Sequence, residues 1–260
     1  MCLFLKRYCA LVVLLLSFSA LASAGDEPVS VAAASDLKFA LSEVAARFQQ
    51  ETGKEVRISF GSSGNFARQI PQGAPFDLFL SADEGYIFRL ATQGFLRDEG
   101  SLYAIGRIVL MVPHGVSIVA DGELKGLATA LREGKVMRFA IANPEHAPYG
   151  KRAEEALKSA GLWEAIKDKL VLGENVSQAA QFATSGSAQG GIFAYSLVLS
   201  PEVAKLGSYA LIPDSMHQPL NQRMALTKRA GTAAEAFYAY LRAPAARAIF
   251  EKFGFTLPAK

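Results

Sequence analysis

Small hydroxyl-bearing residues recur in this chain where an apolar run gives way to a pattern of helical period. The pair Ser35-Asp36 follows one such run, and the pair Ser62-Ser63 follows another. Each pair predicts a strand, a tight turn and the start of a helix. The first N–H groups of a helix have no partner within it, so two helix starts and their hydroxyls, facing one cleft, would bind an anion.

Two further turns of this kind lie in the second half of the chain. They are the sequence Ala-Pro-Tyr-Gly at 147–150 and the segment of Asn175, Val176 and Ser177. Any one of the four turns is most simply a helix cap, because Ser and Asn are preferred at that position. Four of them at strand ends favour a shared site whose neutral donors hold a fully ionised oxyanion. A protonated phosphate carries an O–H group and would also need an acceptor in the site, so donors alone suit it less well.

The sequence gives little support for catalysis or for a metal cation. The esterase turn Gly-x-Ser-x-Gly fails at Asn65, which leaves a secreted serine hydrolase, with Ser63 as nucleophile and His146 as base, as a distant alternative. The histidines are far apart and have no second ligand at metal-like spacing, so a surface or hinge role is the simpler interpretation of His146. Nucleotide-binding glycine motifs are missing. We expect neither an enzyme nor a bound metal cation.

The composition and the first residues indicate an exported, folded protein. The chain has 260 residues, of which 51% are hydrophobic and 20% charged, which allows one large domain or two of ordinary size. Lys6 and Arg7 precede an apolar run that ends in Ala-Ser-Ala, the order of a secretory signal peptide with cleavage after Ala24. That run spans 15 residues, 8–22, whereas a membrane-spanning helix needs roughly 20.

The mature chain is free of cysteine and nearly neutral. Both cysteines, Cys2 and Cys9, belong to the leader, which fits an exported protein that folds without disulfides. Without the leader, 25 basic residues face 24 acidic ones, a net charge of +1, and the charges are interspersed. Nucleic-acid binding needs a basic face, so we expect no nucleic-acid partner.

Strand and helix patterns alternate along the first 80 mature residues. The strongest helix pattern covers 35–53, with Ser35 as the expected N-cap and Gly53 as the C-terminal stop. Strands at 56–60 and 76–80, each followed by a helical pattern, complete a β-α-β-α-β-α order. Alternation of this kind implies a parallel sheet.

The pattern changes at 103–112, an aliphatic strand interrupted by Gly106, where we expect the chain to cross into a second lobe. A return crossing is expected at 212–214. The predicted fold class is α/β with two lobes and two crossings. Open α/β sheets bind ligands at the ends of their strands, so the site should lie between the lobes. The predicted segments are a signal peptide at 1–24, lobe I at 25–104 and 214–260, and lobe II at 105–213.

Five segments of the chain are similar to those of one known family: VAAASDL, FGSSGNFARQIPQGAPFDLFLSAD, ANPEHAPYG, GENVSQAAQFATSG and FGFTLP. Across nearly the whole mature chain they resemble the periplasmic molybdate-binding proteins of molybdate ABC transporters. The resemblance implies the type II periplasmic binding fold, no enzymatic activity and no cofactor. It further implies a periplasmic monomer that holds molybdate or tungstate between its lobes and delivers it to an inner-membrane ABC permease. A binder of another tetrahedral oxyanion, such as sulfate, is the alternative within this class.

The resemblance also implies which residues would bind the ligand. Some family members use a tyrosine in the strand that matches GIFAYS, where this chain has Ala194 followed by Tyr195. Others use the tyrosine of the APYG motif, so Tyr149 is favoured over Tyr195. The implied set is Ser35 and Ser63 through hydroxyl and N–H, Asp36 and Val176 through N–H, and Tyr149.

Overall fold

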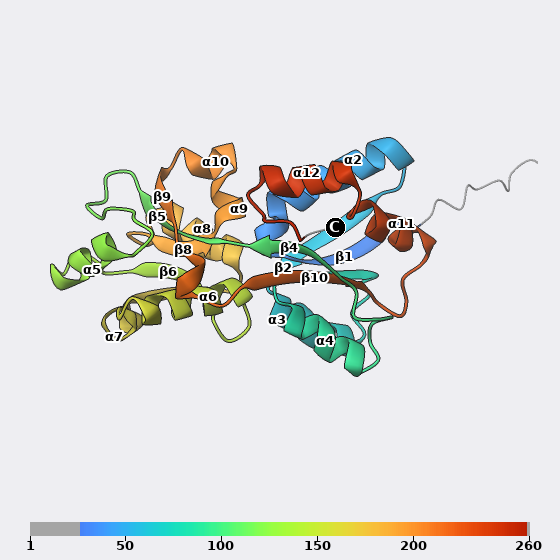
Figure 1. Cartoon of the computed structure of the whole chain (residues 1–260), viewed down its shortest axis with the longest axis horizontal. Helices are drawn as coiled ribbons and strands as arrows, with labels where there is room; N and C mark the ends of the chain where they lie inside the picture. The colour runs from blue at the N-terminus through green and yellow to red at the C-terminus, as the bar shows by residue number, and fades with distance from the viewer. Residues whose placement is uncertain (1–26, 259–260) are drawn as a thin grey trace, which may run out of the picture.

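Two five-stranded sheets, one in each half of an elongated molecule, organise the chain (Figure 1). The computed structural model describes residues 27–258, so the predicted signal peptide lies outside the described residues. Within 27–258, no helix has both the length and the apolar character needed to cross a membrane.

The first sheet has the strand order β2-β1-β3-β10-β4 and is mixed. Strand β1 pairs in parallel with β2 and β3, as the alternating pattern predicts, but β10 runs antiparallel to β3 and β4. The last strand joins in the opposite direction because it returns from the other half of the molecule. The strands are β1 (Val29–Ala34), β2 (Val56–Gly61), β3 (Leu78–Ser81), β4 (Ser101–Gly106) and β10 (Leu220–Leu226).

Helices cover both faces of this sheet (Figure 1). Val31 and Ala33 of β1 belong to the apolar cluster of one face, which includes Phe48 and Phe237, whereas Ala32 belongs to the cluster of the other. Burial on both faces explains why β1 is apolar at nearly every position. One face carries α2 (Lys38–Thr52), α11 (Thr232–Tyr240) and α12 (Pro244–Lys252), and the other carries α3 (Ser63–Gln69) and α4 (Glu84–Thr92).

The second sheet has the order β7-β6-β8-β5-β9 and is also mixed. Its core includes Leu110, Phe139 and Phe193, all fully buried. The strands are β5 (Ile108–Pro113), β6 (Phe139–Ala142), β7 (Leu170–Gly173), β8 (Gly191–Ala194) and β9 (Gly207–Leu211). The helices are α5 (Lys125–Arg132), α6 (Pro148–Ser159), α7 (Trp163–Ile166), α8 (Val176–Thr184), α9 (Tyr195–Val198) and α10 (Pro201–Ala204).

Helix α5 has no counterpart in the sequence predictions. Its N-cap residue, Leu124, has φ of 60° and no capping side chain. The carboxylate of Asp121 accepts the N–H groups of Lys125 and Gly126 instead. Because the capping acid lies outside the usual N-cap position, the sequence lacks the ordinary start signal.

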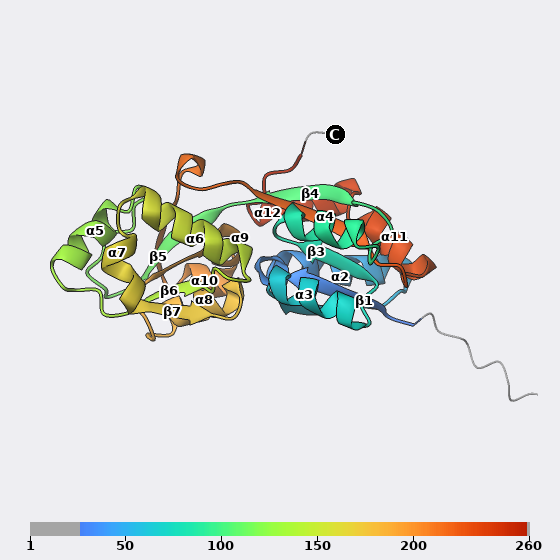
Figure 2. The same ribbon diagram turned by 90° about the horizontal axis from the view of Figure 1, so that it is seen from below.

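The chain passes between the two sheets twice. The single strand predicted at 103–112 is wrong: β4 ends at Gly106 in the first sheet, and β5 begins at Ile108 in the second, with Arg107 between them. The return path runs between β9 and β10, on the same side of the molecule (Figure 2). The lobe boundaries at 104/105 and 213/214 stay predictions. Strand β4 extends two residues past the boundary at 104/105. We call the halves containing the first and the second sheet lobe I and lobe II.

Candidate ligand-binding site

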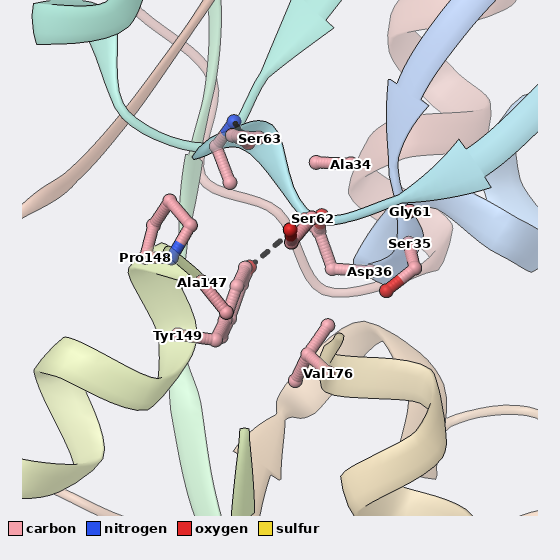
Figure 3. A pocket seen from close by; sticks show the side chains of 11 residues that line it. Ala34, Ser35, Asp36, Gly61, Ser62, Ser63, Ala147, Pro148, Tyr149 and Val176 are labelled. Atoms are coloured by element: carbon pink, nitrogen blue, oxygen red, sulfur yellow. Dashed lines mark hydrogen bonds between the residues drawn. The ribbon is translucent and has the colours of Figure 1, made fainter. Parts of the chain in front are cut away.

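The four hydroxyl-rich turns of the sequence surround one small cavity between the lobes (Figure 3). Each turn starts a helix after a strand ends: the 3-10 helix η1 (Ser35–Leu37) after β1, α3 after β2, α6 after β6 and α8 after β7. Helix starts carry unpaired N–H groups and the positive end of the helix dipole. The cavity is therefore rich in donors, and none of its 11 lining residues is Lys, Arg or His.

All five residues that the family resemblance implied as ligands line this cavity. In Figure 3, Ser35, Asp36 and Ser63 come from lobe I, and Tyr149 and Val176 face them from lobe II. None of the five is more than 4% exposed. An anion held among these side chains would be removed from bulk water, where hydrogen bonds to charge are strong.

Two serines at the start of α3 have different tasks. Ser62 is the N-cap, and its hydroxyl accepts the N–H of Asn65 at 3.4 Å. The Ser63 hydroxyl accepts the N–H of Ala82 at 3.0 Å, which leaves its own proton for an acceptor in the cavity. Ser63 is fully buried, so that acceptor cannot be bulk water.

Ser35 does not cap its own helix, so that prediction is wrong. The chain enters α2 through η1, and neither start has a capping side chain. The Ser35 hydroxyl crosses to lobe II, where it donates to Asn175 Oδ1 at 3.0 Å and accepts the N–H of Ser177 at 3.2 Å. The Ser177 hydroxyl in turn donates to the Ser35 carbonyl at 2.8 Å. Ser35 thus joins the two lobes beside the cavity.

Val176 contributes a helix start from lobe II. It is the first residue of α8, after the N-cap Asn175, whose Oδ1 accepts the N–H of Gln178 at 3.1 Å. A first-turn N–H has no partner inside its helix, so the backbone of Val176 offers a donor where its side chain offers none.

Asp36, Tyr149 and Gln222 form a buried hydrogen-bond network across the lobes. Asp36 Oδ2 accepts the Tyr149 hydroxyl at 3.0 Å, the bond dashed in Figure 3, and Gln222 Nε2 at 2.6 Å. Gln222 Nε2 lies 3.0 Å from the Tyr149 hydroxyl, and Tyr103 donates to Gln222 Oε1 at 2.7 Å. Sequence reasoning missed Gln222, whose only signal is its place in the alternation of β10, in phase with the buried Leu220 and Met224.

Burial governs the protonation of this network. It raises the pKa of the Asp36 carboxyl to about 6, against hydrogen bonds from Gln222, Tyr149 and nearby backbone N–H groups that favour the charged form. Burial, with the Asp36 charge adding to it, also raises the pKa of the Tyr149 and Tyr103 phenols well above the usual value. Both phenols are therefore protonated donors at neutral pH.

Tyr195 lies elsewhere. Its ring stacks on the Arg107 guanidinium, 4.7 Å from ring centroid to Cζ, and lies 6.0 Å from the Tyr209 ring. It is not among the residues that line the cavity. Of the two tyrosines weighed from the sequence, Tyr149 is therefore the one placed at the site.

His146 is buried in the contact between the lobes, so of the two expected roles, surface or hinge, the surface role is wrong. Its Nδ1 lies 3.0 Å from Ser62 Oγ, and its carbonyl accepts the Gly64 N–H at 2.9 Å. The partner is Ser62 and not Ser63, the nucleophile of the hydrolase alternative. Within residues 27–258, no three His, Cys, Asp or Glu side chains are grouped to hold a metal ion.

Comparison with known proteins places this architecture in a family. The model of the bacterial extracellular solute-binding proteins matches residues 29–256. The chain belongs to this family. It is 35% identical to the molybdate-binding protein ModA of Rhodobacter capsulatus, over 91% of this chain and 90% of that one. It is 32% identical to the Escherichia coli ModA, over 91% of each chain.

A solved structure supports the same assignment. The periplasmic molybdate-binding protein of Azotobacter vinelandii superimposes with a TM-score of 0.81 at 31% identity, covering 89% of this chain and 100% of that one. The predicted two-lobe α/β fold and the predicted resemblance to this family are thereby confirmed. The relatives are binding proteins, which also confirms the prediction that the chain is not an enzyme.

Proposed function

We propose that this protein captures molybdate, or tungstate, in the cavity between its lobes. Ser35, Ser63, Asp36 and Val176 supply backbone N–H groups, and Tyr149 closes the site from lobe II. The Ser63 hydroxyl adds its free proton, whereas the Ser35 hydroxyl would turn from Asn175 to the anion on binding. Molybdate and tungstate present four oxygens at nearly the same radius, so both fit one arrangement of donors. No cofactor takes part, and molybdenum enters as the oxyanion rather than as a metal cation.

One observation carries this proposal: helix starts from both lobes meet at a buried cavity that no Lys, Arg or His lines. Neutral N–H and hydroxyl donors stabilise an anion whose oxygens are all acceptors. The names of the relatives point to molybdate among such anions. A sulfate-binding protein of Mycobacterium tuberculosis shares the fold at a TM-score of 0.69 and 20% identity, which bears on the fold alone.

Delivery to a membrane transporter completes the proposed function. Residues 1–24 would export the chain to the periplasm and be removed after Ala24. The monomer would close around the oxyanion and pass it to an inner-membrane ABC permease, the partner that the family assignment suggests.

Calorimetric titration of residues 25–260 with sodium molybdate, tungstate, sulfate and phosphate tests the proposal. Molybdate and tungstate should bind at one site per chain with similar affinity, and sulfate and phosphate at least tenfold more weakly. If sulfate binds as tightly as molybdate, the proposed function changes from a molybdate binder to a binder of tetrahedral oxyanions in general. No heat with any of the four anions, from a folded protein, would overturn the function.

A further inference from the structure

Asp36 places a carboxyl in a cavity that is otherwise built to attract negative charge. It is 1% exposed and lines the cavity. Its Oδ2 accepts two side-chain hydrogen bonds, whereas its Oδ1 is buried and meets no donor in hydrogen-bond geometry, although the backbone N–H groups of Asp36 and Leu37 lie near the carboxyl. Buried polar atoms are rarely left unpaired, so Oδ1 requires an explanation.

A dianion and an ionised Asp36 cannot share this cavity without a strong penalty. The two like charges would be in one desolvated space, and no Lys, Arg or His lines it to offset them. A neutral carboxyl removes the repulsion. It also turns one carboxyl oxygen into an O–H donor, which the anion can accept.

We propose that the Asp36 side chain is part of the oxyanion site and carries a proton in the complex, with Oδ1–H donating to the bound anion. This inference rests on the proposed function and extends it: molybdate binding takes up one proton per chain above the pH at which free Asp36 ionises. The proton comes from solvent and stays on Asp36, so no covalent bond to the ligand forms.

The hydrogen bonds of Oδ2 place the proton on Oδ1. Gln222 Nε2 and the Tyr149 hydroxyl both donate to Oδ2, so that oxygen keeps its acceptor role in either protonation state. Gln222 is itself held by Tyr103, whose hydroxyl donates to Oε1 and so fixes which end of the amide faces Asp36. Oδ1, without a partner, is the oxygen left to carry the proton.

Among residues 27–258, no cationic side chain in contact with Asp36 could neutralise its charge in place of this proton. The titratable neighbours are the phenols of Tyr149 on α6 and Tyr103 on β4, both protonated at neutral pH. Lys38 at the start of α2 is exposed to solvent. The other elements around η1 present uncharged residues: Gly61 of β2, Ser177 of α8, Ser196 of α9 and Gln222 of β10.

The protonation of Asp36 makes the affinity for molybdate depend on pH, and the direction of that dependence can be derived. Burial gives the free carboxyl a pKa of about 6, and a bound dianion raises that pKa further. Below pH 6 the proton is already present, and affinity is independent of pH. Above pH 6 each binding event must add a proton, so affinity falls by up to tenfold per pH unit.

Calorimetry with sodium molybdate provides the test. Titrations at pH 7.5 in two buffers of different ionisation enthalpy should give an uptake of about one proton per chain. Between pH 6.5 and 8.5 the parent should bind on the order of 50-fold more weakly at the higher pH. Molybdate that binds with no proton uptake and a flat pH profile would overturn this inference while leaving the proposed function in place. If titration with molybdate releases no binding heat at any pH, the proposed function itself is contradicted.

Two variants locate the effect. Asp36→Asn keeps the shape and acceptor of the protonated carboxyl, so it should bind molybdate with a flat pH profile and no proton uptake. Glu43→Gln removes an exposed carboxylate that pairs with Lys252 and should keep the parent's pH profile. A pH-dependent Asp36→Asn, or a folded Asp36→Asn that no longer binds molybdate, would overturn the inference.

Discussion

At the scale of single residues, the site separates donors that are already engaged from donors that are free. The Ser35 hydroxyl donates to Asn175, whereas the Ser63 hydroxyl only accepts and keeps its proton for the cavity. Ser63 is therefore the side chain whose loss should act on the ligand most directly.

Ser63→Ala should weaken molybdate binding roughly 10- to 150-fold, because a hydrogen bond to a charged group contributes about 1.5 to 3 kcal/mol. The helix should persist, since Ser62 provides the cap. A calorimetric Kd measures the loss. The matched control is Ser42→Ala, at an exposed serine whose hydroxyl bonds only within α2. Equal affinities for Ser63→Ala and the control would contradict a ligand role for this hydroxyl.

Asp36→Asn should stabilise the ligand-free protein at neutral pH. Burial raises the pKa of Asp36 from 3.8 to about 6, so the folded state holds its proton more tightly than the unfolded state. The stability of the parent is therefore full below pH 4 and falls as the pH rises through 6, by on the order of 3 kcal/mol. Asn cannot ionise and avoids this loss.

Urea unfolding of both proteins at pH 4.5 and pH 7.5 measures this difference. The free energy of unfolding of Asp36→Asn should exceed that of the parent at pH 7.5, and the gap should narrow strongly at pH 4.5. A gap of the same size at both values would mean that the carboxyl does not titrate in this range.

At the scale of elements, the start of α3 packs so closely against lobe II that the backbones of Gly64 and His146 are in contact. A Cβ on Gly64 would lie 2.5 Å from the His146 carbonyl oxygen and 2.9 Å from its Cα. The same glycine donates its N–H to that carbonyl at 2.9 Å. Glycine at this position lets two backbones from different lobes approach, which is the condition for closing the cavity.

Gly64→Ala should hold the lobes apart and weaken molybdate binding by at least about tenfold, or about 1.4 kcal/mol. The clash is between the new Cβ in lobe I and the His146 backbone in lobe II, so the lobes can relieve it by separating, and each should stay folded. Small-angle scattering with molybdate should show a more extended variant. Gly231→Ala is the control, because its Cβ would meet no atom within 4 Å. A compact Gly64→Ala with the parent's affinity would contradict this account.

At the scale of the whole molecule, the proposed ligand would lie between two lobes that each have a sheet of their own. Most of the apolar core of each lobe is its own, but the cluster of lobe II also takes in Ala34 and Ala82 beside the site. Hydrogen bonds such as Tyr149 with Asp36 and Ser35 with Ser177 join the lobes at the same place. A ligand that bridges the lobes therefore adds stability that neither core provides by itself.

Molybdate should raise the melting temperature by on the order of ten degrees at a thousandfold excess over Kd. Binding to the folded state alone adds about 4 kcal/mol at that excess, and a chain of this size gains a few degrees per kcal/mol. Differential scanning fluorimetry measures the shift, with tungstate expected to match it and sulfate at the same concentration to give little. An equal shift with sulfate would contradict the molybdate assignment and leave the fold unaffected.

Local sequence patterns are enough to predict most of the strands and helices of lobe I and the chemistry of the turns. Apolar runs that end in Ser-Asp or Ser-Ser mark a strand followed by a helix start, because the period of the pattern and the turn residues are local properties. The same patterns placed Ser35, Ser63, Tyr149 and Val176 at strand ends. They could not assign the capping at Ser35, because its hydroxyl bonds to a residue 140 positions away.

Which distant residues meet depends on how the chain folds in three dimensions. Strand β10 brings Gln222 to Asp36 across 186 positions, and closure brings Tyr149 to the same carboxyl across 113. Local patterns carry no information on such pairs, because the alternation of a strand can mark Gln222 as inward-facing but cannot say which distant side chain it meets. The protonation of Asp36 belongs to the same class: it follows from desolvation, which exists only once both lobes surround the carboxyl.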